Sequence, residues 1–115
     1  MVAGRDDYEE LIWVIPKSDW ERLGPRARDR LSRILPDVVR HHAKAATHYP
    51  DSNADVLGLA GQFGDIYRKI GPLKRAMWDK EELTREQPPE ILRDLIGHCL
   101  LALQMYDDKE EDDNE

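Results

Sequence analysis

Three side chains that could do acid–base or metal chemistry lie on one face of the last predicted helix. Glu90, Asp94 and His98 are spaced four residues apart, and residues four apart are neighbours on a helix surface. The residues beside Asp94 and His98 are mostly apolar, and a buried carboxylate is costly unless it is paired or ligates a cation. Two interpretations of Asp94 follow: an internal salt bridge to a basic residue, such as Lys69, Lys74 or Arg75, or a site for a divalent metal ion or a substrate.

The preceding helix carries a second carboxylate and several cations. Asp65 lies four residues before Lys69, so it could pair with Lys69 near the start of a helix. Alternatively, Asp65, Lys69 and Asp94 converge on one pocket. Five cations between residues 66 and 80, offset by Asp79, could hold phosphate groups, unless they form only a solvated helix face: Arg68, Lys69, Lys74, Arg75 and Lys80.

The net charge of −7 is concentrated at the C-terminus. Residues 107–115 contain seven acids and one lysine, so this segment carries −6 and the other residues together carry −1. Runs of like charge are usually disordered. We therefore expect a single helical domain over residues 1–106 and an acidic disordered tail over residues 107–115. The negative total makes nucleic acid an unlikely partner and favours a phosphate-bearing small molecule over a long duplex.

The amino-acid composition indicates the cellular compartment in which the protein is expected to act. Cys99 is the single cysteine of the 115 residues, so no disulfide framework stabilises the chain, and a reducing cytoplasm is the simplest setting. No apolar run approaches 18 residues, so no membrane partner is expected. The first ten residues lack a basic-then-apolar signal pattern.

The periodicity of apolar residues predicts an all-α fold, a small bundle of four to five helices. Residues 11–15 form a short apolar run ended by Pro16, which we interpret as an extended N-terminal arm packing on the body. Pro25 can begin a helix, Pro36 should break or kink it, and residues 49–53 predict a turn.

Two longer elements follow. The segment from residue 55 to residue 77 has one apolar stripe. Its glycines at 58, 61 and 64 either admit a close neighbour or precede a helix that starts near Asp65. Gly71-Pro72 should kink or split this helix. The segment from Glu90 to about Tyr106 is apolar over more than half its circumference. We expect it to be the central helix and to require a homo-oligomer to cover it.

These two segments resemble a known family. Phe63-Gly64-Asp65, the basic residues Arg68, Lys69 and Lys74, and the run Leu92-Arg93-Asp94-Leu95 are similar to the pattern of a phage-associated helical family, the nucleotide-modification-associated domain. The last helix also resembles the second metal-binding helix of MazG-type all-α nucleoside triphosphate pyrophosphohydrolases, in which Glu90 and Asp94 would be metal-binding acids. The resemblance covers about residues 60–106.

The resemblance implies roles for individual residues. Asp94 and Glu90 would be catalytic, and Asp94 with Asp65 would hold Mg²⁺, the implied cofactor. The nucleotide would contact Arg68, Lys69 and Lys74, together with Asp65 and His98.

The sequence also departs from the MazG pattern. That pattern has a Glu-x-x-Glu pair on the earlier helix and Glu-x-x-Asp on the later one. Here Asp65 is the single acid between residues 65 and 78, and Ile91 stands where the later glutamate would be. Missing acids favour binding over Mg-dependent hydrolysis.

Three classes of function therefore compete. The first is a small phage-type nucleotide-handling protein that binds a nucleotide or cyclic nucleotide and, if it is an enzyme, acts as a Mg-dependent pyrophosphohydrolase in the host cytoplasm. The second is a non-enzymatic interaction module that docks a host or phage protein, for example as a counter-defence inhibitor. A large exposed apolar stripe would favour this class. The third is a nucleic-acid binder that uses the basic residues between 22 and 48.

Overall fold

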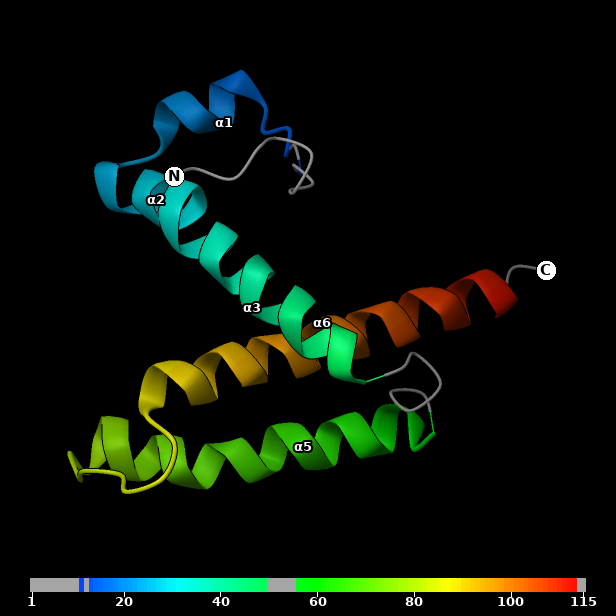
Figure 1. Cartoon of the computed structure of the whole chain (residues 1–115). Helices are drawn as coiled ribbons and strands as arrows, with labels where there is room; N and C mark the ends of the chain where they lie inside the picture. Colours follow the sequence, from blue (N-terminus) through cyan, green and yellow to red (C-terminus); the bar gives the residue numbers. More distant parts are fainter. Residues whose placement is uncertain (1–10, 12, 50–55, 114–115) are drawn as a thin grey trace, which may run out of the picture. The chain divides into compact units, whose positions relative to one another are not determined.

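The chain is all-α, as predicted. A computed structural model (Figure 1) describes residue 11 and residues 13–49 and 56–113, and no strand occurs within these ranges. The elements are α1 (Lys17–Arg22), α2 (Pro25–Asp29), the π-helical turn η2 (Arg30–Ile34), α3 (Leu35–His48), α5 (Gly58–Leu73), the π-helical turn η3 (Lys74–Trp78) and α6 (Pro88–Asp113). They fall into two compact units, residues 1–34 and residues 35–115, which are described separately.

The first unit contains the N-terminal arm, α1 and α2. Leu11 and residues 13–16 have no regular secondary structure, and Val14 is 90% exposed. The described residues of this arm therefore form neither a helix nor a strand. Arg28 holds α1 to α2: its guanidinium donates to the Trp20 carbonyl at 2.9 and 3.3 Å and lies 5.0 Å from the ring centroid. Cation–π contact and hydrogen bonding therefore act together here.

Prolines coincide with π-helical turns. A proline inside a helix removes one N–H donor, and its ring crowds the carbonyl four residues earlier. Pro36 is the second residue of α3, just after η2, and Pro72 lies inside α5, two residues before η3. Of the predicted kink or split at Gly71-Pro72, the split does not occur, since α5 continues through Pro72 to Leu73 and η3 follows directly. The start near Asp65 is also wrong, because α5 begins at Gly58, which has a φ of +62° that favours glycine.

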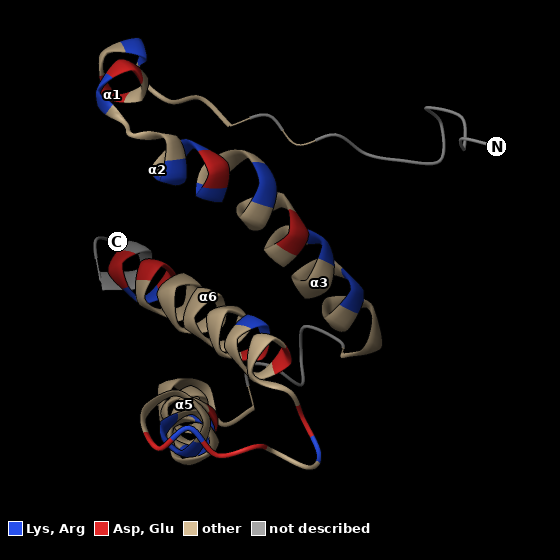
Figure 2. Ribbon diagram, turned by 90° about the vertical axis from the view of Figure 1, so that its left-hand side faces the viewer, with Lys and Arg blue, Asp and Glu red and all other residues tan. Residues whose placement is uncertain are grey.

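In the second unit α6 contacts both α5 and α3 and lies between them (Figure 2). This confirms its predicted central place. Ile91 of α6 is 1% exposed, and Leu73 of α5 and Val38 of α3 are buried as well. These three are the buried apolar residues within the described ranges, so the core of the unit is small and most apolar side chains of the helices keep some contact with solvent.

The C-terminal acidic segment differs from its prediction. The helix α6 continues to Asp113, seven residues into the segment expected to be disordered. Extending an existing helix needs no new nucleus, and Glu and Lys are good helix formers, so the acidic run is added to a helix that packing has already formed. The predicted turn after residue 49 and the end of the tail at 114–115 lie outside the described residues, as do residues 1–10 and 12.

Candidate functional site

The centre of the site is a set of four polar residues that we call the Asp94 network: His41, Lys69, Glu86 and Asp94. One carboxylate oxygen of Asp94 lies 3.0 Å from His41 Nε2, and the other lies 3.5 Å from Lys69 Nζ. The same ammonium lies 3.5 Å from a Glu86 oxygen. The side chain of Lys69 is 12% exposed, so its charge is largely removed from water and balanced by two acids.

Asp94 is held in its charged form. Burial alone would raise the pKa of its carboxyl group, but the hydrogen bond from His41 and the charge and hydrogen bond of Lys69 outweigh burial, so the pKa lies below its ordinary value. The first sequence interpretation of Asp94, an internal salt bridge to Lys69, is thereby confirmed. Since both oxygens of Asp94 already face donors, a metal ion would have to displace Lys69, His41 or both.

Helix α3 supplies groups that the sequence interpretation left out of the site. Besides His41, Asp37 pairs with Arg93 of α6 at 3.1 Å, and His42 approaches α6 where Gly97 leaves room, since a Cβ at Gly97 would lie 3.1 Å from His42 Nδ1. The sequence contained one indication of this: Asp37 and His41 are four residues apart, and residues with that spacing lie on the same face of a helix.

Three other residues predicted for the site, Asp65, Arg68 and His98, form a second group of polar contacts between α5 and α6. His98 Nδ1 lies 2.9 Å from Gln62 Oε1 and 3.8 Å from an Asp65 oxygen, and Asp65 pairs with Arg68 at 3.0 Å. Gln62 is buried, with 5% of its surface exposed. Asp65 and Asp94, the predicted pair of metal ligands, therefore have separate sets of partners, and the pairing of Asp65 with Lys69 is replaced by one with Arg68.

Two predicted residues lie apart from both groups. Glu90 is exposed in the first turn of α6. Lys74 pairs with Asp79 at 3.1 Å and lines an apolar pocket of about 460 Å³ with Ile70, Leu73, Met77 and Trp78. Lys74 therefore does not join Arg68 and Lys69 in one phosphate-binding pocket.

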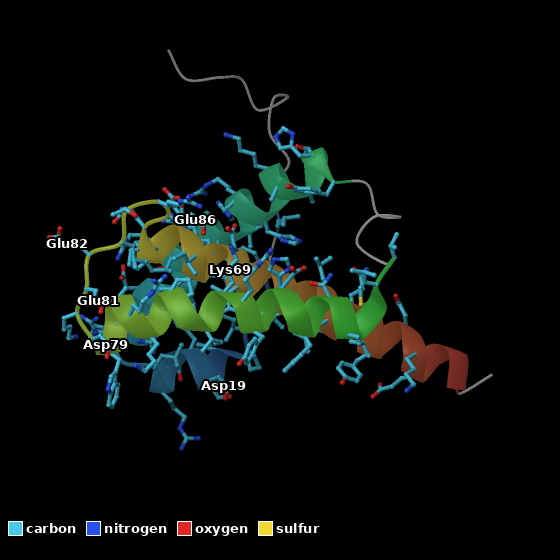
Figure 3. The ribbon with its side chains drawn as sticks, turned by 90° about the horizontal axis from the view of Figure 1, so that it is seen from below. Asp19, Lys69, Asp79, Glu81, Glu82 and Glu86 are labelled. Carbon is cyan, nitrogen blue, oxygen red and sulfur yellow. The ribbon has the colours of Figure 1, made fainter. Side chains whose placement is uncertain are left out.

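An open pocket of about 770 Å³ lies between α5 and the connection from η3 to α6. Figure 3 shows Lys69 beside this connection, which carries Glu81, Glu82 and Glu86. Four cations line the pocket, Arg68, Lys69, Arg75 and Arg85, with Thr84 and the three glutamates. Ile91, Leu83 and Pro72 supply apolar surface. Its volume is within the range of small-molecule sites, about 300–1,000 Å³.

The cations of the pocket are not equally neutralised. Lys69 and Arg68 have carboxylate partners, as described above. Across the described ranges, the side chains of Arg75 and Arg85 have no acid within 4.0 Å. Guanidinium groups without a carboxylate partner can bind a phosphate through two parallel hydrogen bonds. The sequence interpretation counted Arg75 among the basic residues that could hold phosphates, but it did not consider Arg85, because it assigned the phosphates to the helical segment before residue 81.

No group of three or more His, Cys, Asp or Glu side chains in the described part of the chain is arranged to hold a metal ion. None of the described helices is long and apolar enough to cross a bilayer. Comparison of the chain with protein-family models, curated proteins and solved structures yields no match. The resemblance to the phage family and to MazG-type enzymes therefore stays a prediction from the residues quoted for it.

Proposed function

We propose that this is a small nucleotide-handling protein, of the phage type that the sequence resembles, and that it binds the nucleotide in the pocket between α5 and the connection to α6. The observation that carries the proposal is the pair of arginines, Arg75 and Arg85, which line this pocket without acidic partners. They would bind the phosphates, and Ile91, Leu83 and Pro72 offer an apolar surface for a base.

The glutamates of the same pocket suit the rest of a nucleotide. Carboxylates accept hydrogen bonds from hydroxyl and amino groups, which a ribose and a base carry. The pocket therefore fits a ligand that combines an anionic end with hydrogen-bond donors better than a simple polyanion.

Binding is favoured over hydrolysis within this proposal. In a hydrolytic form, Asp94 and Glu90 would act with Mg²⁺ held by Asp94 and Asp65. The contacts of Asp94 with His41 and Lys69 oppose that role, because Mg²⁺ would have to replace two existing partners of the carboxylate. The protein would then retain the nucleotide or cyclic nucleotide intact.

The test is a thermal-shift screen of nucleoside mono-, di- and triphosphates and cyclic nucleotides, with and without Mg²⁺, followed by quantification of the nucleotide. A ligand at 100 times its Kd adds about 2.7 kcal/mol of apparent stability. We expect one class to stabilise the protein and to be recovered intact. The Arg75→Gln/Arg85→Gln variant should lose the shift, and Arg22→Gln/Arg26→Gln, which changes two exposed arginines of the first unit, should keep it. No shift with any nucleotide would refute the proposal.

An apolar stripe on α5 and η3 favours the interaction module as a second candidate. Phe63, Tyr67, Ile70, Met77 and Trp78 are between 49% and 81% exposed and recur at helical spacing. An amphipathic helix of a host or phage protein could place an apolar anchor in the pocket beside Trp78. A photo-crosslinking residue at position 78 should then label one protein, Met77→Asp should abolish the adduct, and the same crosslinker at position 82 should give none. Equal labelling from both positions would contradict this candidate.

A further inference from the structure

The outward face of α6 carries a regular apolar seam. Leu92, Ile96, Cys99, Leu103 and Tyr106 follow one another at intervals of four, three, four and three residues, which is the spacing of the apolar positions in paired helices. All five are exposed: Leu103 is 66% exposed, Tyr106 57% and Ile96 39%, although they belong to the central helix of the unit.

The seam is separate from the faces that α6 already uses. Ile91 and His98 face α5, Arg93 pairs with Asp37 of α3, and Asp94 pairs with both α3 and α5. On an ideal helix each residue is rotated by about 100° from the previous one, so the seam residues fall on the third side of α6. Between Asp94 and Asp107 the helix carries no Lys, Arg, Asp or Glu, and Figure 2 shows this tan stretch of α6 between its two charged ends.

We propose that this seam pairs with the α6 seam of a second copy of the chain, with the two helices antiparallel. A two-fold interface brings one patch against itself, and a seam of uniformly apolar residues is complementary to its own copy. The proposal does not depend on nucleotide binding, because the seam residues neither line the pocket nor belong to the Asp94 network.

The acidic C-terminal end of α6 favours antiparallel over parallel pairing of the two helices. Past Tyr106 the helix carries Asp107, Asp108 and Glu110 against one lysine, Lys109. Parallel helices would place two such acidic ends side by side, and like charges at close range repel each other. Antiparallel helices separate the acidic ends and set each beside the N-terminal half of the other helix, whose dipole end is positive.

The length of the seam bounds its strength. From Leu92 to Tyr106 the helix rises about 21 Å at about 1.5 Å per residue, or two heptads. This is shorter than a stable isolated coiled coil, which needs three to four heptads. We therefore expect a dimer that forms at micromolar concentration and dissociates on dilution.

Cys99 provides the test, because it is the middle residue of the seam and the single cysteine of the chain. A two-fold axis through the seam brings it close to its own copy. With the full chain at micromolar concentration, a short bismaleimide should link two chains through Cys99, and light scattering should give the mass of a dimer. Leu103→Asp should abolish both results. Val56→Asp, which changes a 73% exposed residue outside α6, should abolish neither.

A second experiment tests the direction. In a Cys99→Ala background, chains with Leu92→Cys are mixed with chains with Tyr106→Cys. Antiparallel pairing predicts that the mixed dimer is the main crosslinked product. Crosslinking of Leu92→Cys to itself would overturn the antiparallel arrangement. A monomer by light scattering, or a dimer lost with Tyr67→Asp and kept with Leu103→Asp, would overturn the seam itself.

Discussion

Replacing Asp94 with asparagine tests whether the Asp94 network stabilises the packing of α3, α5 and α6. In the native protein one oxygen of Asp94 faces His41 Nε2 at 3.0 Å and the other faces Lys69 Nζ at 3.5 Å. An asparagine of the same shape offers one acceptor and one NH₂ donor. Its oxygen can face Lys69 while its NH₂ group faces His41 Nε2, which must then accept the hydrogen bond in the other tautomer of the ring. The negative charge between His41 and Lys69 is lost in either orientation, and Glu86 is then the one acidic partner of Lys69.

The magnitude follows from the burial of the group. Loss of a hydrogen bond to a charged partner costs about 1.5–3 kcal/mol when it is buried. The side chain of Asp94 is 35% exposed, so solvent screens part of this interaction, and we expect Asp94→Asn to lower the free energy of unfolding by about 1–2 kcal/mol. Glu90→Gln is the matched control, one turn earlier on the same helix and exposed, with an expected change within about 0.5 kcal/mol.

The effect has a defined dependence on pH. The pKa of Asp94 is lowered in the folded protein, so its contribution is present above the unfolded pKa, about 3.9, and is lost as the pH falls through the folded pKa. The difference between native protein and Asp94→Asn should be constant from about pH 7 to pH 5 and shrink below about pH 4. Urea unfolding followed by circular dichroism, at one protein concentration, measures this. Equal costs for Asp94→Asn and Glu90→Gln, or a difference that grows as the pH falls below the unfolded pKa, would refute the reasoning.

Two further predictions concern the packing around the pocket. Ile91 is 1% exposed at the α5–α6 contact, so Ile91→Ala should cost about 2–5 kcal/mol of unfolding free energy, while a loss under 1 kcal/mol in urea unfolding would show that this contact is not the core. Lys80 has a φ of 61° just after η3, a conformation that costs a side-chain-bearing residue about 1–2 kcal/mol. Lys80→Gly should therefore raise stability by up to about 1 kcal/mol after the added freedom of the unfolded chain is subtracted. A lower melting temperature for Lys80→Gly would contradict that interpretation.

Local periodicity was enough to predict the helices and the central place of α6, because a helix with apolar residues over most of its circumference has to contact several neighbours. It was not enough to predict how prolines are accommodated. Pro36 was expected to break or kink its helix and Gly71-Pro72 to kink or split its own, but α3 and α5 continue through these prolines beside the π-helical turns η2 and η3. That outcome depends on the packing of the flanking turns, which sequence spacing does not contain.

The candidate site was predicted in part for a similar reason. The pairing of Asp94 with Lys69 could be inferred, since a carboxylate on an apolar helix requires a partner. The contribution of His41 could not, because it depends on the packing of α3 against α6 across a sequence separation of 53 residues. Arg75 and Arg85 come together at one pocket through the course of the connection before α6, which has no periodic signal.

The most direct test of the proposed function is a titration of the ¹⁵N-labelled protein with ATP, with and without Mg²⁺, followed by ¹H–¹⁵N correlation spectra. The account predicts saturable shifts of the backbone amides of the pocket, from residue 68 to residue 86, and none in α1 and α2. It also predicts that the shifts disappear in Arg75→Gln/Arg85→Gln. Unchanged spectra with ATP and with each nucleotide of the screen would contradict the account, as would shifts centred on other residues.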